Sequence, residues 1–310
     1  MERLKIAITG ASGFIGANLV RHFNKKHDVY ALTHSKNNWR LKGIQTTSCD
    51  IVNKSKTTSI INKIRPDAVI HCAVYGGYHF EQDPRRIINI NIMGSINLLA
   101  ACKNVPIFIN TGSSSEYGIK NEPMSEADEI AANTNYALSK ALISNLIASE
   151  GLGLTLRLFS VYGYYEEKHR LISYLIYSLL KGKKAKISNL ANVRDFIFIE
   201  DVSSAYEAAI KNYDRVEKGE IFNVGTGKQI DVRSVIEMLG VETELKSVRQ
   251  NEPNRMWQAN ISKIEDKFKW HPKYSLEEGL EKTKKWMLEN IKIYDTDKND
   301  KFYQVKGYIY

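Results

Sequence analysis

The stretch Thr9-Gly10-Ala11-Ser12-Gly13-Phe14-Ile15-Gly16 connects the apolar segment Lys5–Thr9 to the amphipathic segment Phe14–Phe23. A glycine-rich turn between a strand and a helix is typical of a dinucleotide-binding fold. Gly10 permits the tight turn, Gly13 lets backbone amides approach a pyrophosphate, and Gly16 lets the helix pack closely on the strand. The phosphates would lie at the helix N-terminus, where unpaired N–H groups point at them. We therefore expect a cofactor to contact Gly10, Ser12, Gly13, Phe14, Ile15 and Gly16; the alternative is a glycine-rich turn without a ligand.

Short Ile/Val/Ala-rich runs alternate with amphipathic segments over the first half of the chain, which is typical of a parallel sheet covered by helices. The strands that we expect are Lys5–Thr9, Asp28–Leu32, Ala68–Cys72, Ile107–Thr111 and Leu154–Phe159, and the helices are Phe14–Phe23, Lys56–Lys63, Ile87–Cys102 and Asn135–Glu150. After Tyr162 the pattern is less regular. There we expect a helix at Leu171–Leu180, a strand at Asp195–Glu200 and a helix at Asp201–Lys211.

The length of 310 residues suggests two domains. We predict an α/β fold with a doubly wound parallel sheet over residues 1–163, to which the chain returns at about 193–226. A smaller C-terminal α/β lobe, made of residues 164–192 and 227–290, would bind the substrate. Residues 291–310 would form a C-terminal arm that is either docked or partly disordered.

The composition is that of an ordinary soluble globular protein, with 43% apolar and 25% charged residues, and excludes a collagen or a disordered chain. Three cysteines, an odd number, lie in apolar stretches, so we expect no disulfide framework and a cytoplasmic location. The run Leu171–Leu180 is too short to span a bilayer, and the first nine residues do not form a signal peptide. The net charge of +9 comes from scattered basic residues, so we rank solubility first, anionic small ligands second and nucleic acid last. No His, Cys or Asp cluster has the spacing of metal ligands, and we expect no metal, membrane or nucleic-acid partner.

The residues after the second strand bear on the choice of cofactor. A dinucleotide fold usually places an acidic residue about 20 positions beyond the glycine turn, where it binds the ribose 2′-hydroxyl. This chain has Thr33-His34-Ser35-Lys36 there, followed by Arg40, and no carboxylate. These side chains would favour a 2′-phosphate, so we predict a preference for NADP, with NAD possible. The alternative is that they are solvated loop residues without a part in selectivity.

Tyr136-Ala137-Leu138-Ser139-Lys140 puts a phenol and an ammonium on one face of a helix, about 6 Å apart along its axis. A phenol is a weak acid at neutral pH, but a neighbouring ammonium and a positively charged nicotinamide stabilise the phenolate. The serine cluster Gly112–Gly118 follows an apolar strand, and ligands bind at the carboxyl ends of parallel strands. Ser113 is therefore placed to hold a substrate oxygen while Tyr136 transfers a proton. The alternative is one core aromatic residue beside one solvated lysine.

The order and spacing of several motifs resemble the extended short-chain dehydrogenases/reductases that act on nucleotide-sugars. The motifs are Thr9–Gly16, Asp50-Ile51, His71-Cys72-Ala73, Asn91 with Gly94, Ser113–Gly118, Tyr136–Lys140, Arg157–Gly163, Arg194-Asp195-Phe196-Ile197, Phe222-Asn223-Val224-Gly225 and Arg249 to Lys263. The resemblance implies a Rossmann domain, a smaller substrate lobe, and a homodimer formed through the helices Ile87–Cys102 and Asn135–Glu150, whose apolar faces could equally pack internally.

The same resemblance implies the roles of particular residues. The catalytic trio would be Ser113, Tyr136 and Lys140. The cofactor would contact Thr33, His34, Ser35, Lys36, Asp50, Ile51, Cys72, Ala73, Tyr136 and Lys140 in addition to the glycine turn. The substrate would contact Tyr75, Ser114, Ser115, Ser160, Arg194 and Arg249, with Arg255 as an alternative to Arg249 at the diphosphate.

Departures from the family pattern limit the reactions that we expect the chain to catalyse. Sugar-nucleotide 4,6-dehydratases carry an acidic residue just after the catalytic Ser/Thr, whereas this chain has Ser114 and Ser115 and displaces Glu116 by one position, which disfavours dehydration. The Gly-Ser-Ser-x-x-Tyr arrangement is similar to that of reductases acting on 4-keto-6-deoxy sugar nucleotides. GDP-fucose synthase has a cysteine, used for an extra epimerisation, where Ser115 stands. Ala73–Tyr78 and Asn37–Arg40 resemble, loosely, the CDP-paratose, CDP-abequose and dTDP-fucose synthases.

The expected function is therefore NADPH-dependent reduction of the C4 ketone of a dTDP-, CDP- or GDP-linked 4-keto-6-deoxyhexose in deoxysugar biosynthesis. Tyr136 would donate the proton, Lys140 would hold the cofactor ribose, and Ser113 would hold the keto oxygen. One alternative is an NAD-dependent UDP-sugar 4-epimerase, which needs the same three residues. A second is a non-catalytic nucleotide-binding sensor on this fold.

Overall fold

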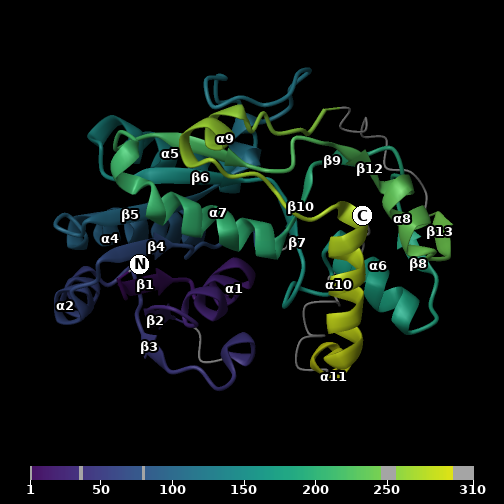
Figure 1. Ribbon diagram of the computed structural model, residues 1–310, viewed down its shortest axis with the longest axis horizontal. Coiled ribbons are helices and arrows are strands. Elements are labelled where there is room, and N and C mark those ends of the chain that lie inside the picture. Colours follow the sequence, from purple (N-terminus) through teal and green to yellow (C-terminus); the bar gives the residue numbers. More distant parts are fainter. Residues whose placement is uncertain (1, 35–37, 79–80, 246–255, 296–310) are drawn as a thin grey trace.

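Seven parallel strands form the central sheet of the protein, whose computed structural model describes residues 2–34, 38–78, 81–245 and 256–295 (Figure 1). In spatial order the strands are β11 (Ile221–Val224), β6 (Leu154–Leu158), β5 (Ile107–Ser113), β4 (Ala68–His71), β1 (Lys5–Thr9), β2 (Asp28–Thr33) and β3 (Thr46–Ser48). The direction in which the chain adds strands reverses between β1 and β4. The predicted doubly wound α/β fold is confirmed, and this reversal is where such sheets bind ligands.

Helices cover both faces of this sheet, because successive side chains of a strand point to opposite faces. Ile6 and Ile8 of β1 join one buried cluster with residues of α1 (Phe14–Phe23) and α7 (Ile199–Lys211). Ala7 joins a second cluster with residues of α2 (Lys54–Ile64), α4 (Ser95–Ala101) and α5 (Asn135–Glu150). Near-continuous apolar strands of this kind are expected where both faces of a parallel sheet are buried.

The helix predicted at Ile87–Cys102 is present, but it starts earlier and is not uniformly α-helical. It consists of α3 (Pro84–Ile87), the π-helical segment η2 (Ile88–Gly94) and α4. Asp83 caps its start by accepting hydrogen bonds from the backbone N–H groups of Arg85 and Arg86. In η2 the Asn91 amide bonds both backbone groups of Tyr75 and the Ser139 hydroxyl, so the widened turn ties the loop after β4 to α5.

The remaining elements are short. They are η1 (Trp39–Leu41), η3 (Ser114–Tyr117), β7 (Ser160–Tyr162), α6 (Leu171–Leu180), β8 (Ala185–Ile187), β9 (Val193–Arg194), β10 (Phe196–Phe198), η4 (Tyr213–Arg215), β12 (Ile230–Asp231), α8 (Val232–Leu239), β13 (Thr243–Leu245), α9 (Ser262–Phe268), α10 (Leu276–Glu289) and α11 (Ile291–Tyr294). Strand pairs β7–β10, β9–β12 and β8–β13 form three small sheets. α6, α8 and α10 lie together on one side of the central sheet (Figure 1). The predicted boundaries between the two domains stay a prediction.

The strand predicted at Asp195–Glu200 is shorter than expected. β10 ends at Phe198, and Ile199 and Glu200 belong to the first turn of α7. Glu200 and Asp201 in that turn suit the positive end of the helix dipole. Of the predicted arm, residues 291–295 are described: Tyr294 of α11 is buried and donates a hydrogen bond from its hydroxyl to the carbonyl of Glu166.

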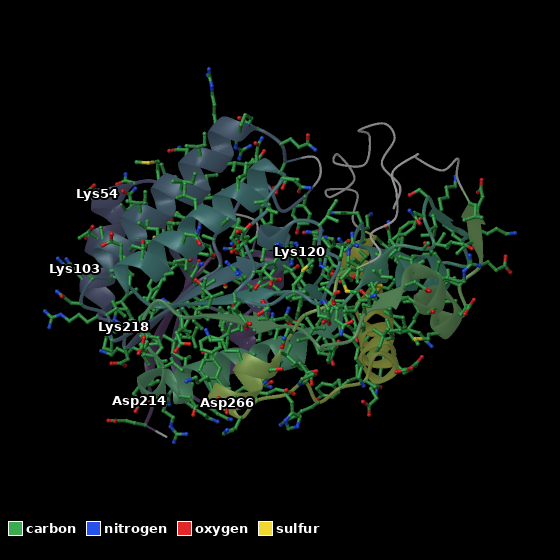
Figure 2. All side chains as sticks on the ribbon, turned by 90° about the horizontal axis from the view of Figure 1, so that it is seen from above. Lys54, Lys103, Lys120, Asp214, Lys218 and Asp266 are labelled. Carbon is green, nitrogen blue, oxygen red and sulfur yellow. The ribbon has the colours of Figure 1, made fainter. Side chains whose placement is uncertain are left out.

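Charged side chains project outward around the molecule, with Lys54, Lys103 and Lys218 among them (Figure 2). All three cysteines are free thiols. Over the described ranges, the helices are all too short or too polar to traverse a lipid bilayer.

Candidate active site

The glycine turn after β1 is held by close backbone contacts. Gly10 has φ +63°, and a Cβ there would lie 2.5 Å from the backbone nitrogen of Ala73. A Cβ on Gly16 would lie 2.4 Å from the carbonyl oxygen of Gly10. Gly13 caps α1 without a side chain, and no acidic residue occupies the first turn of this helix. The turn therefore leaves the N-terminal amides of α1 open to an anion, as a pyrophosphate site requires.

The ends of β2 and β3 lie beside this turn. Thr33 is buried and its carbonyl accepts a hydrogen bond from the amide of Cys49. The exposed imidazole of His34 lies 3.9 Å from the carboxylate of Asp50. Ile51 is buried, and its side chain would be 2.7 Å from a Cβ on Gly94. Ser35 and Lys36 lie outside the described residues.

Arg40 is engaged inside the protein. Its guanidinium donates to the carbonyls of Tyr165 (2.8 Å) and Ser12 (3.2 Å) and pairs with the carboxylate of Glu167. It also stacks on the Trp39 ring, with 4.2 Å from the guanidinium carbon to the ring centroid. The hypothesis that Arg40 donates charge to a 2′-phosphate is therefore not supported, because its partners are already supplied by the protein.

The three candidate catalytic residues line one cavity of about 470 Å³. Ser113 ends β5, and α5 contributes Tyr136 and Lys140. Lys140 is buried and donates from Nζ to the carbonyl of Thr111 at 2.7 Å. The Oγ atoms of Ser113 and Ser115 are 2.8 Å apart. A serine, a tyrosine and a lysine thus converge at the carboxyl edge of the sheet, where a ligand of a parallel sheet binds.

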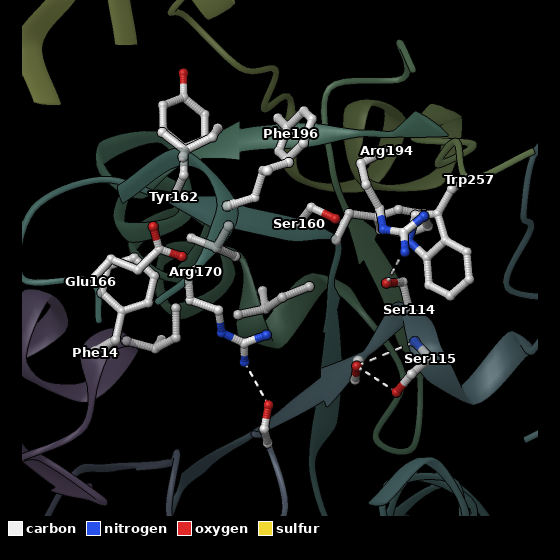
Figure 3. A pocket seen from close by; sticks show the side chains of 18 of the residues that line it. Phe14, Ser114, Ser115, Ser160, Tyr162, Glu166, Arg170, Arg194, Phe196 and Trp257 are labelled. Carbon is white, nitrogen blue, oxygen red and sulfur yellow. Dashed lines mark hydrogen bonds between the residues drawn. The ribbon is translucent and has the colours of Figure 1, made fainter. Parts of the chain in front are cut away.

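The cavity also reaches the cofactor turn and the predicted substrate residues (Figure 3). Its lining includes Phe14, Ile15 and Cys72 from the cofactor list, and Ser114, Ser115, Ser160 and Arg194 from the substrate list. Tyr75 is not among the lining residues; its ring packs against Arg86, 4.3 Å from the guanidinium carbon. Arg249 and Arg255 lie outside the described residues.

Arg194 is a half-buried cation on this cavity. Burial lowers the pKa of its guanidinium to about 10, which leaves it charged at neutral pH. Within the described ranges no carboxylate lies within ion-pair distance of it, and its recorded hydrogen bond goes to the carbonyl of Val193. A desolvated guanidinium without a counter-ion is suited to an anionic group of a ligand, which it can meet with two parallel N–H groups.

Trp257 is a cavity residue that the sequence did not single out. Its ring lies 4.9 Å from the guanidinium carbon of Arg194, and its Nε1–H donates to the Oγ of Ser114 at 3.2 Å. The buried carboxylate of Asp195 accepts from the amides of Thr226, Gly227 and Ala259, and so fixes the segment that carries Trp257. Trp257 lies in the family motif between Arg249 and Lys263, but the sequence alone did not distinguish this residue from its neighbours in the motif.

Two further ionisable residues, Glu166 and Arg170, line the cavity. Burial raises the pKa of Glu166 to about 8, although the Ser173 hydroxyl donates to its carboxylate at 2.8 Å. Arg170 donates to the carbonyl of Gly77 at 2.6 Å. Glu166 is the only carboxylic acid among the described lining residues, and it is mostly protonated at neutral pH. The described lining therefore contributes cations but almost no negative charge.

His71 is a packed core histidine. Burial, with a smaller contribution from Lys140, lowers its pKa to about 3. Its two ring nitrogens bond the hydroxyls of Thr9 (2.7 Å) and Ser95 (2.8 Å). It therefore stays neutral and links β1 to the helix behind β4.

Known proteins similar to this chain act on nucleotide sugars. The UDP-glucuronate 4-epimerase of Thermodesulfobacterium geofontis is 27% identical over 319 residues, covering 92% of this chain and 97% of that protein. The dTDP-glucose 4,6-dehydratase of Salmonella typhimurium is 26% identical, with 93% of each protein covered. The structure of UDP-glucuronic acid 4-epimerase from Bacillus cereus in complex with UDP-glucuronic acid and NAD is similar with a TM-score of 0.79 and 26% identity, covering 93% of this chain and 99% of that one. Residues 6–225, well over half of the sequence, match the model of the NAD dependent epimerase/dehydratase family, and the chain therefore belongs to this family.

Proposed function

We propose that the protein is an NAD-dependent 4-epimerase of a UDP-linked sugar. The serine turn, residues 113–117, had instead led us to expect reduction of a keto sugar, with a UDP-sugar 4-epimerase as the first alternative. The observation that carries it is that Ser113, Tyr136 and Lys140 share one cavity with the start of the cofactor helix and with the unpaired cation Arg194. Such a cavity contains the side chains that proton transfer at a sugar hydroxyl beside a bound nicotinamide requires, and almost no negative charge among its described lining residues to repel a diphosphate.

In this proposal the glycine turn at Gly10, Gly13 and Gly16 would hold NAD, which would supply an acceptor for the hydride of C4 and a donor that returns it to the opposite face. The phenolate of Tyr136 accepts the proton of the C4 hydroxyl as the C4–H bond breaks, and gives it back in the return step. Ser113 holds the C4 oxygen in both directions, and Lys140 stabilises the phenolate. Arg194 holds the diphosphate, so the sugar is free to turn while the nucleotide stays bound. No external reductant is consumed.

The surroundings of the adenosine ribose support NAD over NADP. Asp50 places a carboxylate at the end of β3, next to His34, and a carboxylate repels a 2′-phosphate. Arg40, which would have attracted that phosphate, is paired with Glu167. The predicted preference for NADP now depends on Ser35 and Lys36. The similar B. cereus enzyme binds NAD, which also supports NAD.

Dehydration is disfavoured by the position of the acidic side chains. Ser114 and Ser115 follow Ser113, and a hydroxyl does not remove a proton from carbon unaided. Glu116 is fully buried and bonded to Arg157, outside the cavity. Glu166 lies on the cavity but is mostly protonated at neutral pH. Among the described residues, no ionised carboxylate lies on the cavity where a dehydratase needs one.

For the substrate we propose UDP-glucose or UDP-glucuronate. Arg194 suits the diphosphate, and Figure 3 shows Arg170 in a separate part of the cavity. A second cation suits a second anionic group, which UDP-glucuronate has and UDP-glucose lacks. The ratio of kcat/KM for the two substrates measures whether Arg170 serves this purpose.

We also propose a homodimer formed through η2, α4 and α5. Large apolar side chains are exposed on these elements: Ile88, Met93, Ile96, Leu138 and Leu142. η2 packs against α5 and continues into α4, so these side chains lie on neighbouring elements. Large exposed apolar patches mark interaction sites. Leu142→Glu should convert a dimer to a monomer in light scattering, while the exposed Ile119→Glu on another part of the surface should not. A monomeric wild type would contradict the dimer.

Cofactor content and product analysis test the function. The purified protein should contain tightly held NAD and should interconvert UDP-glucose and UDP-galactose, or the corresponding uronic acids, without added cofactor. If it instead purifies empty, leaves these sugars unchanged and oxidises NADPH with a dTDP-, CDP- or GDP-4-keto-6-deoxyhexose, it is the reductase. If neither assay shows turnover, the non-catalytic sensor becomes the better account.

A further inference from the structure

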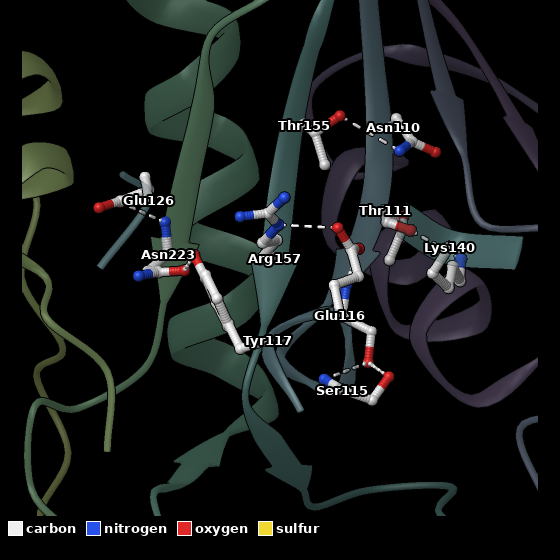
Figure 4. Close-up of polar contacts among 11 residues, drawn as sticks. Asn110, Thr111, Ser115, Glu116, Tyr117, Glu126, Lys140, Thr155, Arg157 and Asn223 are labelled. Carbon is white, nitrogen blue, oxygen red and sulfur yellow. Dashed lines mark hydrogen bonds and ion pairs between the residues drawn. The ribbon is translucent and has the colours of Figure 1, made fainter. Parts of the chain in front are cut away.

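A buried ion pair lies directly behind the serine turn (Figure 4). Glu116 and Arg157 are 0% and 1% exposed, and the Nε of Arg157 lies 2.7 Å from Oε2 of Glu116. The other carboxylate oxygen, Oε1, accepts a hydrogen bond from the backbone N–H of Ser113 at 2.8 Å. One carboxylate therefore connects a cation of β6 to the first residue of the serine turn.

The packing leaves this carboxylate little freedom to move. Arg157 pairs with Gly112 in the register of β5 and β6, so the cation lies beside the residue before Ser113. A Cβ on Gly112 would lie 2.9 Å from Oε1 of Glu116 and 3.0 Å from Cγ of Arg157. The Arg157 guanidinium also lies over the Tyr117 ring, 4.6 Å from its centroid, and the Tyr117 hydroxyl donates to Asn223. Both sides of the pair are thus fixed by neighbours that lie far apart in the sequence.

Stability alone is a poor reason for this arrangement. Desolvation of two charges can cost as much as their attraction returns, and apolar residues of similar volume often replace a buried pair without loss. What an apolar pair does not supply is an acceptor for the Ser113 N–H. That hydrogen bond, with the bond from the Ser115 N–H to the Ser113 Oγ at 3.2 Å, closes the turn and sets the direction of the Ser113 side chain.

We propose that Glu116, held in place by Arg157, is a positioning residue for Ser113. It fixes the serine turn so that the Ser113 hydroxyl faces the C4 oxygen of the sugar; this rests on the proposed function in so far as Ser113 holds that oxygen. In the proposed function the nucleotide end of the substrate is held by Arg194, whose recorded hydrogen bond goes to the carbonyl of Val193 and not to the pair. Loss of the positioning contact should therefore lower kcat and leave KM nearly unchanged.

Two matched double variants distinguish the effect of the hydrogen bond to Ser113 from the effects of the buried charges and of lost stability. Glu116→Gln with Arg157→Met removes both charges but keeps a carbonyl oxygen that can accept from the Ser113 N–H. Glu116→Met with Arg157→Met removes the same charges in nearly the same volume and also removes the acceptor. We expect the Met/Met variant to lose about 100-fold in kcat relative to wild type, because small displacements at a reacting centre have effects of that size, and the Gln/Met variant to retain most of it. Both should keep KM within about threefold, since the nucleotide contacts are unchanged.

A structural role alone would make kcat follow the melting temperature, so both quantities are measured for each variant. Glu116→Asp provides a third test if the Met/Met variant does not fold: it keeps the negative charge but shortens the side chain by one methylene, which withdraws the carboxylate from the Ser113 N–H, and should lower kcat more than the Gln/Met variant does. Equal kcat for all variants that fold would overturn the proposal.

Hydrogen–deuterium exchange of the peptide covering residues 113–117 tests the same contact without substrate. In the ligand-free protein the Met/Met variant should exchange faster there than the Gln/Met variant, while a peptide from α2 exchanges equally in both. If wild type shows no epimerisation, the proposed function fails and exchange alone decides this inference, with equal exchange in the two double variants overturning it. If wild type is active and Ser113→Ala lowers kcat, the kinetic comparison decides it.

Discussion

Arg157 and Arg194 are two buried or half-buried arginines at the same edge of the sheet, and their surroundings differ. Arg157 is paired with the carboxylate of Glu116, and both lie away from the cavity surface. Arg194 lines the cavity and has no carboxylate partner among the described residues. Arg157 has its counter-ion inside the protein and belongs to the architecture, although its buried Nη1 has no hydrogen-bond partner among the described residues. A desolvated cation that lacks a counter-ion is available to a ligand, and this contrast supports the proposal that Arg194 binds the substrate.

The largest fall in kcat is expected for a substitution of Tyr136, because neither arginine can transfer the proton in its place. Tyr136→Phe removes the group that moves the proton and should lower kcat by about 10²- to 10⁴-fold, the usual contribution of general acid–base catalysis. The melting temperature and the NAD content should stay close to wild type, because the ring remains. Near-normal turnover of this variant would remove Tyr136 from the mechanism.

Arg157→Met alone tests whether Arg157 stabilises the folded protein. It leaves the Glu116 carboxylate buried without its counter-ion, and the free energy of unfolding should fall by about 3–5 kcal/mol. Chemical denaturation measures this value. The Gln/Met double variant should recover most of the loss, since it removes the unpaired charge. An unchanged free energy of unfolding in the single variant would show that the pair does not hold the turn.

Arg194→Met tests whether Arg194 binds the diphosphate of the substrate. Loss of a charged hydrogen-bond donor to the diphosphate should weaken substrate binding by about 1.5–3 kcal/mol, or about 10- to 100-fold in KM, with a smaller change in kcat. The free energy of unfolding should not fall, because the substitution leaves no buried charge unpaired. A large loss of stability with unchanged KM would reverse the roles given to the two arginines.

Glu166 is a buried acid on the same cavity. Its titration should change the free energy of unfolding, and we expect this to be the smallest of the four effects. Burial raises its pKa in the folded protein to about 8, above the ordinary 4.5, so the folded state holds a proton that the unfolded state releases. This contribution is complete below pH 4.5 and is lost as the pH rises through about 8. Glu166→Gln does not titrate. Between pH 6 and pH 8 the free energy of unfolding of wild type should therefore fall by about 2 kcal/mol relative to the variant. Parallel pH profiles for the two proteins would contradict the raised pKa.

The parts of the molecule that local sequence determines were the parts that could be predicted. The glycine turn, the apolar strands and the spacing of Tyr136 and Lys140 each lie within a short segment, and the structure has the predicted turn, strands and helices there. The sequence showed Glu116 only as an acidic residue one position away from the dehydratase acid, because its partner, Arg157, lies on another strand. The same reason hid the engagement of Arg40 with Glu167 and the placement of Trp257 on the cavity. Contacts between distant segments decide whether a charged residue is architectural or functional, and a sequence pattern does not reveal them.

Transfer of deuterium at C4 tests the central claim most directly. UDP-glucose and UDP-glucuronate, each labelled with deuterium at C4, are incubated with the enzyme as purified, without added cofactor, and the products are analysed by NMR. The account predicts that at least one of them gives its C4 epimer with the deuterium still on C4, since the hydride that leaves is the one that returns. Absence of the epimer from both sugars, or an epimer that has lost its deuterium to solvent, would contradict it.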